Sequence, residues 1–402
     1  MTAAPLDDAR RADPLYRRLD DLCRAPSWWR PADQGPSPGE GPAAAVVARD
    51  LSERDWLRVS VEEAAPGRPN VYAADGPDDR VELLILGHLD TVPPTPGWSQ
   101  PAHSVSAGRY HALGAADTKG GIAAVLDAVE RVGPTRGLGL LLYADEEYTF
   151  QGMQDFLRRH PAVKPARVLS VCGPPARMLS GCRGIIELEL VVRGRPGHAS
   201  RPWEGTSAVA ALQAITDRLQ AWVPAQPTLH RSVCNVAAVH AGSLVDEVPA
   251  GRRGPPPLSD TPNRIPDVAW SLVEVRPGGP ELSAEGLEAQ AQAALAAFNA
   301  GADFPARLDR FDVHFELAGY QSGPEAIAPF VRHFGHLHGG AHSDPGNSGY
   351  IDVAMLAAQR QCGAVCMGPL SGGAHAPDEW VDLAGLTAYR DGMVALLAER
   401  RA

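Results

Sequence analysis

Short apolar runs alternate with amphipathic patterns over the first part of the chain. Runs that are apolar at almost every position cover residues 81–87, 139–144 and 167–171. Residues 120–132 instead place their apolar side chains at helical spacing on one face. Strands buried on both faces are apolar throughout, so this alternation predicts an α/β domain whose sheet is covered by helices.

A different order of predicted strands and helices begins near residue 182. The elements expected there are strands over 185–192, 232–239, 268–275 and 313–318 and helices over 207–222 and 283–298. This order predicts a four-stranded α+β sheet, ferredoxin-like, with two helices on one side. The alternation of strand and helix patterns resumes near residue 323 and ends with a helix after Asp382. We therefore expect one discontinuous domain, residues 1–181 and 322–402, interrupted by an inserted domain of residues 182–321.

The charge balance excludes several classes of partner. The 402 residues include 37 Lys+Arg and 48 Asp+Glu, a net charge of −11, which argues against nucleic acid or an anionic membrane. No apolar run reaches the about 18 to 20 residues of a membrane span. The N-terminus alternates charges where a signal peptide is apolar, so we expect a cytoplasmic protein. The six cysteines form no CxxC pair and predict reduced thiols, not a disulfide scaffold or zinc ribbon.

Proline and glycine are concentrated between Pro249 and Pro266. This composition excludes a helix or a central strand and predicts an extra surface loop. Loops longer than about 12 to 15 residues are usually functional or disordered. The sequence leaves both interpretations of residues 250–265 open.

Four polar motifs lie at the ends of predicted strands or at strand-to-helix turns, where α/β sheets build their sites. His88 and Asp90 end an apolar strand and, two residues apart, point to the same face. Asp117 lies in a small-residue turn that opens a helix, where an N-cap is the ordinary explanation. Residues 145–147, Asp-Glu-Glu, follow another buried strand, and His375 follows two glycines before the last helix. Two histidines and several carboxylates predict a zinc or cobalt site.

The motif order HxD, GAADTKGG, DEE and GGAHAPDE resembles the acetylornithine deacetylase / succinyl-diaminopimelate desuccinylase / glutamate carboxypeptidase family of two-metal peptidases and deacylases. The resemblance covers nearly the whole chain, including an inserted lid or dimerisation domain with the sequence RPGHAS at residues 195–200. It implies a zinc-peptidase-like catalytic domain, with a mixed sheet covered by helices, and the four-stranded lid. It also implies a homodimer formed through the lid, with a monomer as the alternative.

The resemblance assigns roles to the motif residues of the catalytic domain. It implies that His88 binds one metal, that Asp117 bridges two metals, and that Glu147 and His375 bind the other. Glu146 is then the general base, and Asp90 orients His88. The implied metal is Zn²⁺, with Co²⁺ as a substitute, and the implied substrate is a small amino-acid derivative or peptide.

Three residues of the inserted domain also receive roles from the resemblance. His198 corresponds to a histidine that stabilises the oxyanion, in many members from the partner subunit. Arg276 corresponds to an arginine that clamps a substrate carboxylate, although an exposed strand-end arginine is the other interpretation. Asp246 stands where the family usually has asparagine. A carboxylate cannot donate the amide hydrogen bond and favours a cationic substrate group instead.

One expected metal ligand is missing. Family members carry a carboxylate after the fourth strand, and the corresponding residue here is Gly173. Three hypotheses remain open: Cys172 supplies a thiolate in its place, the site holds one metal through Asp117, Glu147 and His375, or hydrolysis has been lost. A buried structural thiol is the ordinary explanation for Cys172.

The leading hypothesis is a metal-dependent hydrolase that cleaves the amide bond of an N-acyl amino acid or small peptide, as a deacylase or carboxypeptidase does. The alternative is a one-metal or metal-poor relative that forms or transfers amide bonds, or binds amino-acid derivatives without turnover. Gly173 and Asp246 favour the alternative. The one-letter pattern GxSxG at residues 35–39 lies in a Pro/Gly-rich stretch and follows no predicted strand, so it is not a nucleophile elbow. No GxxxxGK phosphate loop occurs in the sequence.

Overall fold

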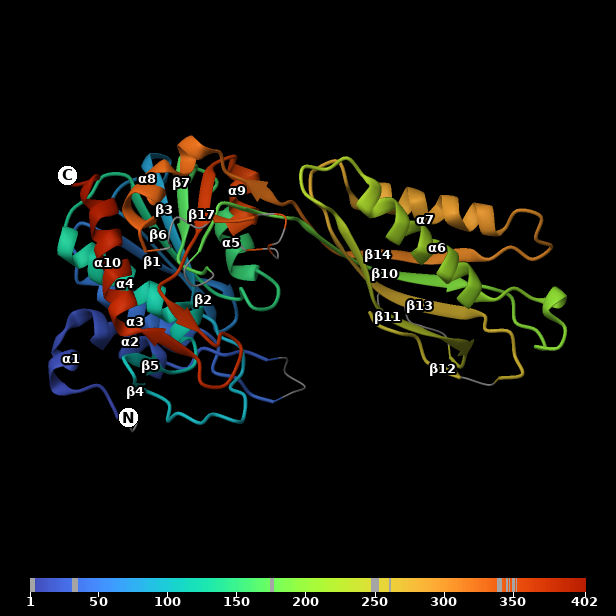
Figure 1. Cartoon of the computed structure of the whole chain (residues 1–402), viewed down its shortest axis with the longest axis horizontal. Coiled ribbons are helices and arrows are strands. Elements are labelled where there is room, and N and C mark those ends of the chain that lie inside the picture. The colour runs from blue at the N-terminus through green and yellow to red at the C-terminus, as the bar shows by residue number, and fades with distance from the viewer. Residues whose placement is uncertain are drawn as a thin grey trace. The chain divides into compact units, whose positions relative to one another are not determined.

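The structure is a computed structural model that describes residues 4–30, 35–173, 177–246, 253–259, 262–337, 342–344, 346, 348, 351 and 353–402. The chain divides into two compact units (Figure 1). Unit 1 contains Met1–Gly181, Gln321–Pro345 and Ile351–Ala402, and unit 2 contains Cys182–Tyr320 and Gly346–Tyr350. A stretch of unit 1 therefore lies on each side of unit 2 in the sequence.

Unit 1 is built around a mixed sheet with the strand order β1-β2-β6-β3-β7-β17-β8-β16. Its strands are β1 (Arg58–Ala65), β2 (Arg68–Ala74), β3 (Leu83–His88), β6 (Leu138–Tyr143), β7 (Arg167–Ser170), β8 (Met178–Leu179), β16 (His342–Ser343) and β17 (Gly363–Cys366). The central strands β6, β3, β7 and β17 run parallel to one another. Both β3 and β6 are buried at every position, as the apolar runs predicted.

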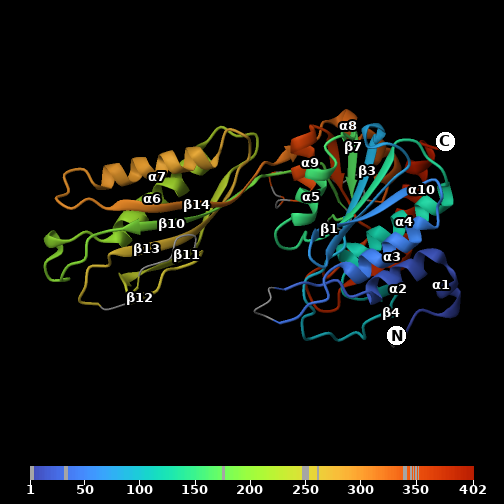
Figure 2. The ribbon, with the colours of Figure 1, turned by 180° about the vertical axis from the view of Figure 1, so that it is seen from behind.

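Helices cover both faces of this sheet, which confirms the predicted α/β architecture. They are α1 (Asp8–Ala12), α2 (Pro14–Arg24), α3 (Gly41–Ser52), α4 (Gly120–Val132), α5 (Gln151–Arg159), α8 (Pro324–Phe334), α9 (Val353–Arg360) and α10 (Leu383–Ala398). Figures 1 and 2 show α4 and α10 on one side of the sheet and α5 and α9 on the other. Because α4 packs against both α2 and α10, nearly all of its residues are buried. Among the described residues, no helix is long and apolar enough to cross a membrane.

A second, smaller sheet of unit 1 has the order β18-β19-β5-β4. Its strands are β4 (Ser104–Ser106), β5 (Arg109–His111), β18 (Ser371–Gly372) and β19 (Trp380–Asp382), and β9 (Gly181–Cys182) pairs separately with β15 (Tyr320–Gln321). The loop between β18 and β19 contains His375. The small sheet therefore anchors the last of the four motifs at both of its ends.

Unit 2 is a sheet with the order β12-β11-β13-β10-β14 and two helices. Its elements are β10 (Ile185–Arg193), α6 (Ala208–Trp222), β11 (Val233–Leu244), β12 (Leu258–Ser259), β13 (Val268–Arg276), α7 (Ala284–Phe298) and β14 (Arg307–Leu317). In both views α6 and α7 lie together on one face of this sheet.

The predicted number of four strands in unit 2 is too low, because β12 is a fifth. This strand lies within the proline-rich stretch, and its described residues pair with β11 at Ser243 and Leu244. A two-residue edge strand bonds on one side only, which is why prolines next to it are tolerated. Of the loop predicted over residues 250–265, residues 250–252 and 260–261 lie outside the described residues.

Candidate metal centre

Three neighbouring parallel strands bring together two of the predicted motifs and Cys172. His88 is the last residue of β3, residues 145–147 follow β6, and Cys172 follows β7. The sheet places β6 and β7 on either side of β3. The carboxyl ends of adjacent parallel strands meet at one edge of the sheet, so these residues lie around one point.

The His88 ring is fully buried and fixed at both nitrogens. Its Nδ1 lies 3.1 Å from the backbone oxygen of Asp90, and its Nε2 lies 2.9 Å from Oδ1 of Asp117. Burial alone lowers the pKa of the imidazole, but Asp117 and Asp90 outweigh it and raise the pKa of His88 well above its usual value. A ring held through Nδ1 presents Nε2 in a fixed direction, as a metal ligand requires.

Asp117 lies in the turn η3 (Ala115–Lys119), which precedes α4. The turn begins at Gly114, whose left-handed backbone, with φ of 77°, suits glycine, and the Asp117–Thr118 peptide is cis. The Asp117 carboxylate has a histidine on each side: Oδ1 lies 2.9 Å from Nε2 of His88, and Oδ2 lies 3.2 Å from Nε2 of His375. Burial opposes ionisation, but bonds from both histidines lower the pKa of Asp117. Each oxygen is thus available to a different metal.

Asp90 holds the Asp145–Glu147 turn. Its Oδ1 accepts the backbone N–H of Glu146 at 3.1 Å, and its Oδ2 accepts that of Glu147 at 3.0 Å. The same Oδ1 lies 3.5 Å from Nδ1 of His88. One buried carboxylate therefore positions two of the motifs relative to each other.

The remaining predicted ligands lie close to Asp117. Nε2 of His375 lies 2.9 Å from Oε1 of Glu147, and hydrogen bonds with Asp117 and Glu147 raise the pKa of His375 to about 10. Loss of hydration, followed by the charges of neighbouring carboxylates, raises the pKa of Glu146 to about 8 against the opposing effect of His88. Burial raises the pKa of the Cys172 thiol, with Asp117 adding to the shift.

Three groups of side chains among the described residues bring their ligand atoms within 4.8 Å of one another: His88, Asp117 and Cys172; His88, Glu146 and Glu147; Asp117, Glu147 and His375. The first and third groups share only Asp117 and use its two different oxygens. Imidazole, carboxylate and thiol are all zinc ligands. The arrangement therefore fits two cations on either side of Asp117.

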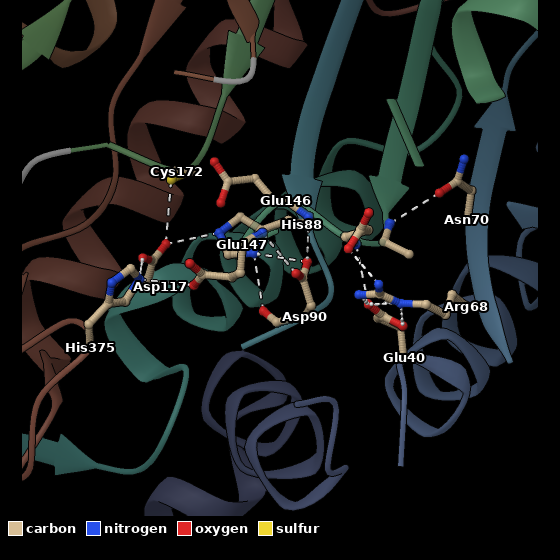
Figure 3. Close-up of polar contacts among 12 residues, drawn as sticks. Glu40, Arg68, Asn70, His88, Asp90, Asp117, Glu146, Glu147, Cys172 and His375 are labelled. Atoms are coloured by element: carbon tan, nitrogen blue, oxygen red, sulfur yellow. Dashed lines mark hydrogen bonds and ion pairs between the residues drawn. The ribbon is translucent and has the colours of Figure 1, made fainter. Parts of the chain in front are cut away.

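Sequence reasoning missed a buried ion pair network behind the Asp145–Glu147 turn (Figure 3). Nε of Arg68 donates to both oxygens of Glu40, at 3.1 and 3.0 Å, and Nη1 donates to Asp145. The three side chains are at most 7% exposed, and the Trp29 ring lies 4.7 Å from the guanidinium. Asp145, which has a left-handed φ of 66°, is held there by this network. No local pattern links three residues so far apart in sequence.

Replacing Arg68 with methionine is expected to lower the free energy of unfolding by about 3–5 kcal/mol, because Glu40 and Asp145 would stay buried without their cation. Urea denaturation checks this value. Arg58→Met is the matched control, since Arg58 is 58% exposed and pairs with Asp78 at the surface. The control should cost less than about 1 kcal/mol. Equal losses in the two variants would contradict the role of the network.

Glu379 was also missed, although it is the last residue of the fourth motif. Its carboxylate accepts the backbone N–H groups of Gly114 and Ala116, both at 2.8 Å, and of Asp117 at 3.1 Å. Burial raises the pKa of Glu379 to about 7 against the lowering effect of these three bonds. The C-terminal part of unit 1 thus fixes the turn that carries Asp117.

Three predicted site residues belong to unit 2. His198 is exposed, and its Nδ1 accepts the backbone N–H of Ser200 at 3.2 Å. Arg276 ends β13, and its Nε and Nη2 donate to Glu274 at 2.9 and 3.0 Å. Asp246 is exposed beyond the end of β11. The guanidinium group of Arg276 is therefore already hydrogen-bonded to a carboxylate of its own strand.

Residues 84–399 match the model described as peptidase family M20/M25/M40. The chain belongs to this family. The match confirms the resemblance drawn from the four motifs and places the chain among hydrolases of amide bonds.

Curated relatives and solved structures agree with the family. An acetylornithine deacetylase of Vibrio campbellii is 29% identical over 380 residues, which span 89% of this chain and 88% of the relative. A probable carboxypeptidase of Aspergillus terreus is 32% identical over 53% of this chain and 54% of its own. The fold is similar to that of aminopeptidase PepT from Bacillus cereus, with a TM-score of 0.71, 17% identity and coverage of 96% and 98%. A dinuclear metal binding peptidase from Bacillus subtilis gives a TM-score of 0.65, 17% identity and coverage of 98% and 99%.

Proposed function

We propose that the protein hydrolyses the amide bond of an N-acyl amino acid or a small peptide with the help of bound Zn²⁺. The observation that carries this proposal is the position of Asp117, whose two carboxylate oxygens face His88 and His375 separately. A carboxylate arranged in this way fits between two cations. The deacetylase and peptidase relatives in the family support the same chemistry.

We assign His88 and Asp117 to one metal position, and Asp117, Glu147 and His375 to the other. Co²⁺ is the expected substitute, because it accepts the same ligand types. Metals bound there would polarise the amide carbonyl of the substrate and lower the pKa of a water molecule. This assignment is supported by the first and third groups of ligand atoms described above, which share Asp117.

Glu146 is the proposed general base. It precedes the proposed ligand Glu147, and its backbone N–H is fixed by Asp90. It accepts a proton from the attacking water and then gives that proton to the leaving amine. Asp90 acts as a positioning residue, because it holds the turn that carries Glu146 as well as the strand end that carries His88.

For unit 2 we propose the roles implied by the resemblance. Because Nδ1 of His198 accepts a hydrogen bond, the proton of the neutral ring lies on Nε2, which is then a donor suited to an oxyanion. A substrate carboxylate would take the place of Glu274 on Arg276, and Asp246 would favour a cationic substrate group. A homodimer through unit 2 is supported by β11, which pairs with β12 only near its end and exposes Val233 and Val239.

The second candidate function is amide formation or transfer, or binding without turnover, by a relative with one metal or none. The observation that favours it is Gly173, which offers no carboxylate where family members carry one. In this case the position formed by Asp117, Glu147 and His375 would be the one that keeps its metal.

Metal removal separates the two candidates. Protein stripped with a chelator is expected to lose turnover of a panel of N-acyl amino acids and dipeptides, and added Zn²⁺ or Co²⁺ should restore it. Amine release and metal content by mass spectrometry are the two measurements. Loaded protein that turns over no member of the panel would contradict the hydrolase proposal and favour the second candidate.

A further inference from the structure

The Cys172 side chain points into the metal centre. It lies two residues beyond the end of β7, and its Sγ lies 3.4 Å from Oδ1 of Asp117 (Figure 3). This is the oxygen that faces Nε2 of His88 at 2.9 Å. The ligand atoms of the three residues lie within 4.8 Å of one another. Sulfur, nitrogen and oxygen thus converge on one position.

Gly173 has no room for a side chain. A Cβ atom built on it would lie 2.6 Å from both Cα and N of Met367 and 2.9 Å from the carbonyl carbon of Cys366. These are backbone atoms at the end of β17, so no rotation of a neighbouring side chain relieves the clash. A carboxylate at this position would require movement of the β17 backbone. Any further protein ligand of this metal position therefore comes from a residue other than 173.

We propose that Cys172 binds the first metal as a thiolate, together with Nε2 of His88 and Oδ1 of Asp117. This inference rests on the proposed function only in assuming that the centre binds a divalent metal. Binding forms a sulfur–metal bond and breaks the S–H bond, and the proton passes to solvent. A thiolate carries the single negative charge that a carboxylate would supply. The mixed ligand set keeps the charge of the site and favours Zn²⁺ or Co²⁺ over Mn²⁺ or Mg²⁺.

The absorption spectrum of the Co²⁺-loaded protein tests the proposal independently of activity. A cobalt–thiolate bond gives an intense near-ultraviolet charge-transfer band, which nitrogen and oxygen ligands do not give. The full-length wild type loaded with Co²⁺ is expected to show this band. Cys172→Ser should lose this band and bind one equivalent of Co²⁺ more weakly. Loss of a residue that only hydrogen-bonds to a metal ligand lowers metal affinity by about 10–100-fold, and loss of the ligand itself should lower it further.

Three further variants control the result. Cys362→Ser removes a free cysteine elsewhere in unit 1 and should keep the band. Cys172→Asp should recover two equivalents of Co²⁺ without the band, which shows that the folded site is intact. The double variant Cys172→Ser/Gly173→Asp should recover neither the second equivalent of Co²⁺ nor the charge-transfer band, because the new aspartate side chain clashes with the backbone of Met367.

Two results would overturn the proposal: a wild type that binds two equivalents of Co²⁺ without the band, or a Cys172→Ser protein that keeps it. The proposed hydrolase function fails separately. A band that depends on Cys172, in a protein that hydrolyses no amide, would support the thiolate ligand and contradict hydrolysis. Amide hydrolysis by a Co²⁺-loaded protein without the band would support the hydrolase function and contradict the thiolate ligand.

Discussion

Replacing Glu146 with glutamine is expected to lower kcat for amide hydrolysis by about 10²–10⁴-fold, the usual contribution of a general base. Glutamine has nearly the same shape but cannot accept the proton of the attacking water. The backbone N–H of residue 146 would still donate to Asp90, so the turn that carries Glu147 should keep its position. Metal content should therefore stay at the wild-type value.

Steady-state kinetics and metal analysis on the same preparation check this expectation. Glu53→Gln is the matched control, because Glu53 is exposed next to α3 and its substitution makes the same change in charge. The control should retain wild-type kcat. A Glu146→Gln protein with full metal content and undiminished kcat would show that another group accepts the proton.

Replacing Asp117 with asparagine is expected to remove metal as well as activity. An amide offers one oxygen in place of two, and its NH₂ group cannot bind a cation. Whichever side the NH₂ group faces, either the position beside His88 or the one beside His375 loses a ligand. Loss of several kcal/mol of transition-state stabilisation corresponds to a fall in kcat of more than about 10³-fold.

Metal analysis distinguishes this variant from Glu146→Gln. The Asp117→Asn protein should contain at least one equivalent less than the wild type after dialysis against buffer with trace Zn²⁺. Its free energy of unfolding should be compared in the presence of chelator, so that metal binding does not contribute. Wild-type metal content in the variant would contradict the bridging role of Asp117.

The central strands and α4 could be predicted because burial imposes a simple pattern. A strand covered on both faces is apolar throughout, and the runs at residues 81–87, 139–144 and 167–171 correspond to β3, β6 and β7. The helix predicted over residues 120–132 has the bounds of α4. The motif residues could be found for a related reason, since each lies at the end of a predicted strand or between a predicted strand and a predicted helix.

Elements with an open face were harder to predict. Charged residues alternate along β14, whose pattern is half-exposed, so only its last part was expected. β11 was predicted to end five residues early for the same reason, because its exposed side chains are mixed in character. β12 owes its existence to hydrogen bonds with β11 and not to its own sequence.

Two sets of contacts between distant segments could not be predicted. Arg68 bonds to Glu40 and Asp145, and Glu379 bonds to the turn at Asp117, without any local pattern that marks the pairs. The sequence showed that Gly173 lacks a carboxylate. It did not show that the backbone of Met367 leaves no space for one.

The positions of Glu379 and His375 in the sequence determine when the site can be completed during translation. Both are translated after all of residues 182–320, yet one fixes the turn at Asp117 and the other faces Asp117 directly. On the ribosome, β3, β6 and β7 emerge long before β17 and before β18 and β19, the two strands that flank His375. Such long-range closure is slow compared with local folding. Until the segment that carries His375 has emerged, the nascent chain lacks one of the proposed ligands, and we expect tight binding of metal only after that point.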